Sequence, residues 1–246
     1  MNEEIGQKVF QQAIDIFVTP EIERRKKMNK LSSNFKLEQI QIIFSSKSGR
    51  SYVRLNKEVK AIIKCKANKP IKKGDAVYEN DVDRIESIEL TKGDSNYGHI
   101  TLLYFKGNWI VSFNFIYNKE EIKKHVEASK EFYESAKENL KKGRLRPLFE
   151  NAFASAELLT KSILLSLPNK KLLGGKNHRE KKDFLKNWAN LGNVKIEYST
   201  TLSRLYSLRS SARYLSSDDY KKEDPIKIIN NLKKMIDFGE KSIQFS

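Results

Sequence analysis

Apolar residues at helical spacing open the chain and predict an amphipathic helix over residues 3–18. The positions that carry this period are Ile5, Val9, Ala13 and Phe17. Thr19-Pro20-Glu21 then has the composition of a new helix start, with a capping hydroxyl, a proline at the first helical position and an acid in the first turn. The four cations of residues 24–27 would point in several directions on this second helix, which predicts a solvated surface.

From Leu37 the period changes to two, which is typical of strands. One run alternates on Ile40, Ile42 and Phe44, and a later one on Val59, Ala61, Ile63 and Cys65. The other positions of the later run are mostly lysine, so it predicts a strand with one buried and one basic face. Ser48-Gly49 and Lys106-Gly107-Asn108 predict hairpin turns. We therefore expect five or six mainly antiparallel strands.

The last predicted strand carries an aromatic stripe. Its members are Trp109, Val111, Phe113, Phe115 and Tyr117, and the opposite face has Ser112 and Asn114. A stripe of this kind can stack nucleic-acid bases. The favoured interpretation is a core face, because the alternate positions are polar.

Helical spacing returns near Lys119 and continues to the C-terminus. Helices are predicted over residues 119–142, 145–167, 199–215 and 225–242, with a further one that Asn177 caps. The small residues Ala152, Ser155 and Ala156 would let another helix approach closely, and Glu157 and Lys161 would form an i,i+4 ion pair. The pattern predicts an α+β fold: a β-rich domain over residues 1–118, followed by an antiparallel five-helix bundle over residues 119–246.

Composition changes this picture mainly through charge. The 246 residues carry a net charge of +16, of which residues 1–118 contribute +6 and residues 119–246 contribute +10. Such an excess favours polyanions, nucleic acid above all, with solubility as the alternative explanation. The sequence has no apolar run of membrane-spanning length and no signal-peptide pattern, so we expect a cytoplasmic protein.

Metal and cofactor chemistry is not predicted. Cys65 is the only cysteine, so an internal disulfide and a thiolate cluster are excluded, and a small buried hydrophobe is the expected role. The three histidines, His99, His125 and His178, have no ligand spacing; His99 is expected to be structural and His125 to pack.

Three segments of the C-terminal half resemble the HEPN superfamily in their order and spacing. They are Ala152-Phe-Ala-Ser-Ala-Glu157-Leu-Leu-Thr-Lys161, Asn177-His178 and Leu208-Arg209-Ser-Ser-Ala-Arg213-Tyr214. The resemblance implies a helical domain of about 125 residues. Many HEPN proteins are metal-independent ribonucleases of toxin–antitoxin, phage-defence and RNA-processing systems. They commonly form homodimers in which arginine–histidine pairs face one cleft, the arginine holding phosphate and the histidine serving as acid or base.

The sequence departs from this pattern at the motif that carries catalysis. No histidine follows Arg209 or Arg213; after four intervening residues from Arg209 the chain has Tyr214, and a phenol with a pKa near 10 is a poor base at neutral pH. We therefore expect standard ribonuclease activity to be absent. The residue left as an alternative base, besides Tyr214, is His178.

The candidate phosphate-binding residues are basic. They are Arg204, Arg209 and Arg213 in one predicted helix and Arg179, Lys181 and Lys182 after the glycine-containing loop, with further lysines and arginines at residues 141–146 and 170–176. The alternative for the arginines is ion pairs with Glu157 or other acids of the bundle.

Three functions follow as hypotheses. The first is RNA or nucleotide binding without catalysis, with the N-terminal domain engaging a protein partner. The second is a ribonuclease with His178 or Tyr214 as a substitute base, and the third is a dimerisation or docking module.

Overall fold

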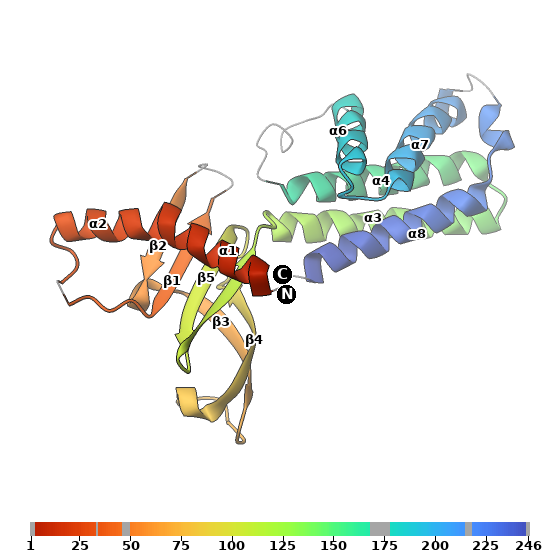
Figure 1. Cartoon of the computed structure of the whole chain (residues 1–246). Helices are drawn as coiled ribbons and strands as arrows, with labels where there is room; N and C mark the ends of the chain where they lie inside the picture. The colour runs from red at the N-terminus through yellow and green to blue at the C-terminus, as the bar shows by residue number, and fades with distance from the viewer. Residues whose placement is uncertain (1–2, 33, 46–49, 168–177, 215–217, 245–246) are drawn as a thin grey trace. The chain divides into compact units, whose positions relative to one another are not determined.

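The computed structural model describes residues 3–32, 34–45, 50–167, 178–214 and 218–244. The chain divides into two compact units, Met1–Ile116 and Tyr117–Ser246 (Figure 1). The helices are α1 (Glu3–Ala13), α2 (Thr19–Lys27), α3 (Lys119–Lys141), α4 (Leu145–Leu165), α6 (His178–Asn190), α7 (Ile196–Tyr214) and α8 (Pro225–Gln244). The strands are β1 (Gln39–Phe44), β2 (Ser51–Leu55), β3 (Ala61–Ala67), β4 (Val82–Leu90), β5 (Gly98–Phe105) and β6 (Asn108–Asn114). The predicted α+β class is confirmed.

The leading helix is continuous, because the π-helical turn η1 (Ile14–Val18) joins α1 to α2. Helix α2 begins at Thr19 with Pro20 and Glu21 in its first turn, as predicted, but Thr19 has helical torsion angles, φ −56° and ψ −51°, so it is not the predicted N-cap. A proline inside a regular helix removes one hydrogen bond and crowds the carbonyl four residues earlier. The wider π turn directly ahead of Pro20 is the local geometry that accommodates it.

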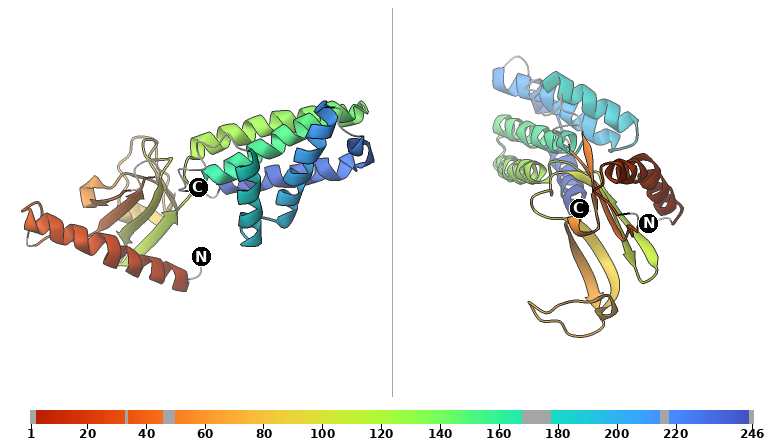
Figure 2. Two further views of the ribbon diagram at one scale, coloured as in Figure 1. Left: turned by 90° about the horizontal axis from the view of Figure 1, so that it is seen from above. Right: turned by 90° about the vertical axis from the view of Figure 1, so that its left-hand side faces the viewer.

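The main sheet has the strand order β2-β1-β5-β6, and all of its neighbours are antiparallel. One face packs against the leading helix (Figure 2). The core of this layer consists of Ala13, Val18, Ile40, Ile42, Leu55, Ile100 and Leu102. Trp109, Val111 and Phe113 pack against that core, so the favoured interpretation of the aromatic stripe is confirmed for these three residues. The strand ends at Asn114, and Phe115 is half-exposed.

The other face of the main sheet carries buried polar groups. Gln41 is fully buried; its Nε2 donates to the carbonyl of Lys60 (2.8 Å), and its Oε1 accepts from Arg54 Nη1 (2.8 Å). Arg54 Nη1 also donates to Asp94 (2.6 Å). His99 is buried and bonds Thr101 through Nδ1 (2.9 Å), a structural contact of the kind the sequence predicted.

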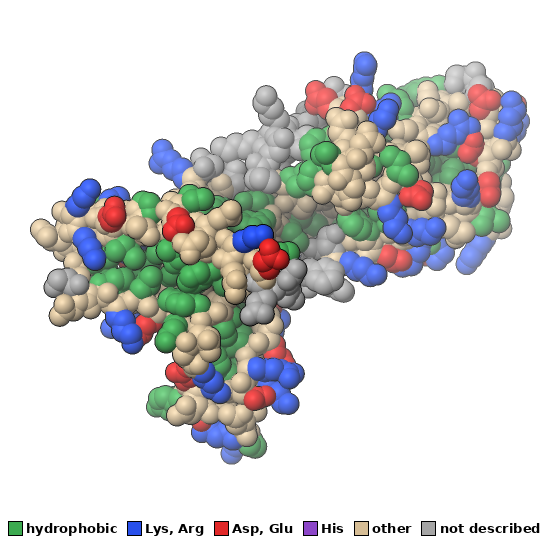
Figure 3. Space-filling view, in the orientation of Figure 1, with side chains coloured by type: hydrophobic (Ala, Val, Ile, Leu, Met, Phe, Trp, Pro, Cys, Tyr) green, Lys and Arg blue, Asp and Glu red, His purple; other side chains and the backbone are tan. Residues whose placement is uncertain are grey.

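A second sheet consists of β3 and β4 alone. The predicted buried face of β3 is wrong at Ile63, which is 44% exposed, and Cys65 is only half-buried. The residues of this pair that are buried lie on β4, among them Ile88 and Leu90. In Figure 3, hydrophobic side chains gather in the middle of the visible face of the N-terminal unit, with lysines and arginines at its margins.

The C-terminal unit contains five described α-helices. Helices α3, α4 and α8 run side by side, whereas α6 and α7 stand across α4 (Figures 1 and 2), so they are not lengthwise members of an antiparallel bundle. Helix α3 approaches α4 closely where the fully buried Ser129 Oγ donates to the carbonyl of Ser155 (3.1 Å). Small residues therefore permit the close approach that the sequence predicted.

The hairpin turn predicted at Ser48-Gly49 and the cap predicted at Asn177 lie outside the described residues. Helix α7 begins at Ile196, three residues earlier than predicted, and η4 (Asp219–Lys222) is a short 3₁₀ turn ahead of α8. Among the described helices, none has the length and apolar character that crossing a membrane requires.

Candidate functional site

Helix α4 presents two carboxylates and a phenyl ring to its crossing helices. Glu150, Phe153 and Glu157 are spaced by three and four residues, which places them along one stripe of the helix. Phe153 is buried, and the two glutamate side chains are 26% and 21% exposed. Each carboxylate receives cations from a different helix.

Glu150 is shared by two arginines of α7. Arg209 Nε lies 3.4 Å from Oε2, and Arg213 Nε lies 3.2 Å from Oε1. The Arg213 contact is electrostatic, since Oε1 has no hydrogen bond of good geometry within the described residues. The guanidinium carbon of Arg209 also lies 4.8 Å from the centre of the Phe153 ring. One carboxylate thus faces two guanidinium groups, which leaves an excess of positive charge.

Glu157 binds two residues of α6. His178 Nδ1 lies 2.5 Å from Oε1, and Lys181 Nζ lies 3.1 Å from the same oxygen. An ionised carboxylate only accepts hydrogen bonds, so Nδ1 carries the proton and the Nε2 of a neutral ring is left as the acceptor. The predicted pair with Lys161 is wrong: among the described residues, the ion-pair partners of Glu157 are His178 and Lys181.

Tyr206 of α7 completes the arrangement. Its ring centre lies 6.1 Å from that of Phe153 and 6.5 Å from that of His178, and Lys182 Nζ is 5.5 Å from it. We name this group the α4–α6–α7 cluster; its members are Glu150, Phe153, Glu157, His178, Lys181, Lys182, Tyr206, Arg209 and Arg213. Four permanent cations and two carboxylates give it a net charge of +2 with His178 neutral.

Comparison with protein families identifies the helical unit, because residues 122–243 match the HEPN domain family. The C-terminal half of the chain is therefore a HEPN domain. Comparison with curated proteins gives no match.

The HEPN domain brings together most of the residues predicted from its sequence. Arg209, Arg213, His178, Lys181 and Lys182 all lie in the α4–α6–α7 cluster. The arginine–histidine combination that α7 lacks as a linear motif therefore exists in space, since Arg209 and His178 both contact the Phe153 ring.

Other predicted residues lie apart from the cluster. Arg204 Nε bonds Glu223 (2.7 Å), and this hydrogen bond raises the pKa of the Arg204 guanidinium. The Arg179 side chain is 84% exposed and lies 3.9 Å from Asp183. Tyr214 is 70% exposed at the end of α7. Arg204 thus does not extend the row that Arg209 and Arg213 form.

The first predicted group of loop cations lies away from the start of α6. Arg146 lies in the first turn of α4 and donates to the hydroxyl of Tyr220 (3.0 Å). Glu157, which binds the start of α6, is eleven residues further on, or roughly 16 Å along the helix axis. Residues 170–176 fall outside the described residues.

Sequence reasoning missed Glu150, Phe153 and Tyr206. The spacing of Glu150, Phe153 and Glu157 was a usable signal for one face of α4, but it does not tell which helices would cross that face. Tyr206 gives no signal of its own, because a tyrosine at helical spacing is most often part of a core.

No metal centre can be assigned within the described residues, where no group of three or more His, Cys, Asp and Glu side chains is suitably placed. Two cavities of the N-terminal unit are lined by described residues. One, of about 420 Å³, lies beside Arg25 and Glu58. The other, of about 440 Å³, has a mainly apolar lining that includes Ile63, Val82 and Phe105.

Proposed function

We propose that the HEPN domain binds RNA or a nucleotide through the α4–α6–α7 cluster. The observation that carries this proposal is the sharing of Glu150 by Arg209 and Arg213. Each guanidinium has five N–H donors, and within the described residues Glu150 is the ion-pair partner of both. Several donors therefore remain for a phosphate, whose geometry matches an arginine fork.

The electrostatic setting supports the same ligand. The C-terminal half carries a charge of +10, and the cluster contributes +2 of it on a single face. Arg213 is 46% exposed, so a phosphate can reach its guanidinium without displacing packed side chains. Lys182 adds a cation from α6 beside Tyr206. Lys181 adds a second one, which is 13% exposed and paired with Glu157. Phosphate contacts of this kind give affinity rather than sequence selectivity.

Retention of a fluorescent RNA pool by the full chain, in chelator and over a salt series, tests this proposal. We expect Arg213→Ala to weaken binding about tenfold and to reduce the slope of log affinity against log salt by roughly 0.7, the value for one phosphate contact on a single strand. Arg204→Ala is the matched control, because it removes an arginine of the same helix that pairs with Glu223. Binding that ignores salt, or equal losses in both variants, would contradict the proposal.

A metal-independent ribonuclease is the second candidate, favoured by the contact of Arg209 and His178 with one Phe153 ring. Glu157 orients the imidazole so that its Nε2 can accept a proton, as a carboxylate does for a histidine base in other hydrolases. His178 is 43% exposed and reachable by a substrate. In this mechanism Arg209 would hold the phosphate and Nε2 would take the proton of the attacking hydroxyl.

Cleavage assays distinguish the two candidates. If the domain is a nuclease, RNA is cut in chelator, His178→Ala abolishes cutting while RNA retention persists, and Glu157→Gln lowers the rate with little change in binding. Cutting that survives Arg209→Ala combined with Arg213→Ala excludes this site. Cutting lost with Tyr214→Phe instead would assign the base role to Tyr214.

The wider setting is also a proposal and rests on the HEPN family. We propose that the domain forms a homodimer, that the N-terminal unit engages a protein partner, and that the protein serves a bacterial defence or toxin–antitoxin system in the cytoplasm. Light scattering after size exclusion tests the first of these: a mass near 57 kDa, twice the 28.6 kDa of the chain, supports it, and a mass near 28.6 kDa excludes it.

A further inference from the structure

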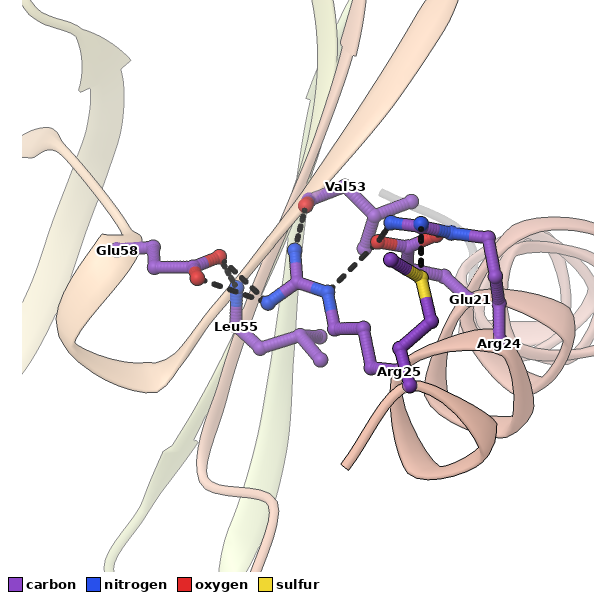
Figure 4. A network of polar contacts seen from close by, with 7 residues as sticks. Glu21, Arg24, Arg25, Val53, Leu55 and Glu58 are labelled. Carbon is purple, nitrogen blue, oxygen red and sulfur yellow. Dashed lines mark hydrogen bonds and ion pairs between the residues drawn. The ribbon is translucent and has the colours of Figure 1, made fainter. Parts of the chain in front are cut away.

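The two edges of the main sheet differ in whether their backbone groups have partners. At the β2 edge, the carbonyl of Val53 accepts a hydrogen bond from Arg25 Nη2 (2.8 Å), and the N–H of Leu55 donates to Glu58 Oε2 (3.1 Å) (Figure 4). A row of free N–H and C=O groups at a sheet edge is a template for another strand, and native proteins commonly block it. The β2 edge is blocked by these two side chains.

The β6 edge carries backbone groups without such partners. Strands β5 and β6 are joined by the two-residue turn Lys106-Gly107, in which both φ angles are positive (48° and 82°). The residue pair that flanks a two-residue turn is hydrogen-bonded, and hydrogen-bonded and non-hydrogen-bonded pairs alternate from there. The N–H and C=O groups of Trp109, Val111 and Phe113 therefore point away from β5. Across the part of the chain that the structure describes, none of these groups has a hydrogen-bond partner.

The β6 edge also lacks the features that usually keep strands apart. Residues 108–117 contain no charged side chain, although 32% of the chain is charged. Strand β6 has no proline, and its pairing with β5 is regular along its length. The lysine of the turn, Lys106, donates through Nζ to the carbonyl of Val82 (2.7 Å). The edge is thus regular and uncharged, the combination that favours pairing with a further strand.

The side chains of β6 match those of a second β6 strand. In an antiparallel pair centred on Val111, the two copies of Val111 lie opposite each other, and each Trp109 lies opposite the partner's Phe113. All three are outward-facing positions, so each of these pairs is hydrogen-bonded in both directions. Trp109, Val111 and Phe113 are only partly buried against the core of their own unit. Cross-strand aromatic pairs stabilise a sheet, and these would join the aromatic stripes of two copies.

We propose that β6 pairs antiparallel with β6 of a second copy about a two-fold axis at Val111, which joins the two four-stranded sheets into one. A segment of another protein can use the same backbone groups, but the matching order of side chains is already present in β6. Residues 1–118 carry a charge of +6, and the absence of charge along β6 lets two such units meet without like charges at the contact. This interface is independent of the RNA-binding proposal and of pairing through the HEPN domains.

Light scattering of the full chain without RNA tests this inference through the Val111→Pro variant. Because the Val111 N–H points outward, proline there removes no hydrogen bond to β5 but blocks a further strand. We expect the unsubstituted chain to have a mass near 57 kDa, twice 28.6 kDa, or near 114 kDa, four times 28.6 kDa, if the HEPN domains also pair. Val111→Pro should halve either mass. Val53→Pro is the matched control at the blocked edge, where the Val53 carbonyl also points outward, and it should leave the mass unchanged.

A cysteine crosslink tests the same pairing without a change of the backbone. The two copies of residue 111 would have Cα atoms about 5.5 Å apart, the spacing of a hydrogen-bonded antiparallel pair and within the range of a disulfide. Val111→Cys is placed in a Cys65→Ser background, which removes the chain's only native cysteine. On mild oxidation it should form a disulfide-linked dimer at least about tenfold faster than Val53→Cys in the same background.

Three results overturn the inference. An unsubstituted chain at 28.6 kDa would leave an extended segment of another protein as the occupant of the edge. A mass that Val111→Pro does not lower, with circular dichroism unchanged, would assign association to the HEPN domain. Equal crosslinking of Val111→Cys and Val53→Cys would mean that only chance collisions join the edges, and this readout decides if Val111→Pro fails to fold. RNA retention should be unchanged in each variant, so failure here leaves the proposed function standing.

Discussion

Two arginine–carboxylate groups in this molecule differ in what they leave unused. In the N-terminal unit, Arg25 donates through Nε to Glu21 (2.6 Å), through Nη1 to Glu58 (2.8 Å) and through Nη2 to the carbonyl of Val53 (2.8 Å), as Figure 4 shows. Its side chain is only 14% exposed. In the HEPN domain, Arg213 is 46% exposed. Its ion-pair partner within the described residues is Glu150, a carboxylate that Arg209 also contacts.

The difference shows how to separate an arginine whose donors are satisfied within the protein from one that keeps donors for a ligand. Arg25 connects α2 to β2 and to the turn η2 (Asn56–Glu58), and each of its three donating nitrogens has a protein acceptor. A phosphate at that guanidinium would have to displace a partner, at the cost of leaving a partly buried carboxylate unpaired. Arg213 can donate to a phosphate while Glu150 stays paired with Arg209. The availability of donors, rather than the presence of charge, distinguishes the two.

Removing Arg25 should have the largest effect on stability. We expect Arg25→Ala to lower the free energy of unfolding of the N-terminal unit by about 3 kcal/mol, because it breaks the mostly buried pair with Glu21 and leaves the Val53 carbonyl without this partner. RNA retention should be unchanged. Urea unfolding followed by Trp109 fluorescence in a Trp188→Phe background measures this unit alone, since the chain has only these two tryptophans.

The neighbouring Arg24 supplies the control. Its side chain is 56% exposed and its ion-pair partner among the described residues is Glu21, so Arg24→Ala should lower the free energy of unfolding much less than Arg25→Ala does. Equal losses of unfolding free energy for Arg24→Ala and Arg25→Ala would show that burial does not determine how much each arginine stabilises the fold. A loss of RNA binding in Arg25→Ala, with the HEPN domain still folded, would place a binding site where we expect a structural one.

Acid should destabilise the same group by a somewhat smaller amount. The hydrogen bond from Arg24, with a second from Arg25, holds the pKa of Glu21 at about 2, below its ordinary 4.5, against the opposing effect of burial. Because the folded pKa is the lower one, the stabilisation is present above pH 4.5 and is lost as the pH falls towards 2. The largest cause is the hydrogen bond from Arg24, whose side chain is 56% exposed, so solvent screening reduces the expected loss to about 2 kcal/mol.

The measurement is the free energy of unfolding of the N-terminal unit at several pH values between 6 and 2, with Trp109 as the probe. Glu21→Gln should be less stable at pH 6 and should lose less stability on acidification. Parallel curves for Glu21→Gln and the unsubstituted protein would mean that other carboxylates govern the acid response.

The same contrast explains which features the sequence could predict. Hydrophobic period identified the sheet, the core face of Trp109 and Val111, and the helices of the HEPN domain, because burial acts on every residue of an element. The ion-pair partners of charged side chains were harder to predict. The cations of residues 24–27 predicted a solvated surface, yet Arg25 is mostly buried. Its partner Glu58 lies 33 positions away in sequence and contacts it only in the folded chain, so no local pattern could predict the pair.

In the candidate site, too, the cations could be predicted and their partners could not. Arg209, Arg213 and His178 were found from residue type and family resemblance, whereas their carboxylate partners were not. Glu157 was predicted to pair with Lys161 on its own helix, but it binds α6 instead. A surface i,i+4 pair stabilises by only a few tenths of a kcal/mol, so cations brought by a crossing helix readily replace it. Local spacing cannot show which helix will cross.

The smallest expected effect gives the sharpest test of the comparison, because it changes only the carboxylate that Arg209 and Arg213 share. Glu150→Gln removes the charge that competes with a phosphate and keeps the shape of the side chain. We expect RNA affinity to rise about threefold, equivalent to about 0.7 kcal/mol, and the stability of the HEPN domain to fall by about 1 kcal/mol as two partly exposed ion pairs are lost. Glu58→Gln, the matching change beside Arg25, should lower stability without raising affinity.

The two readouts are RNA anisotropy at constant salt and urea unfolding, with Trp109 reporting on the Glu58 variant and Trp188 on the Glu150 variant. An affinity that falls in Glu150→Gln would mean that the glutamate holds both arginines in their binding positions rather than competing with the ligand. Donor availability would then be the wrong criterion for separating the two clusters.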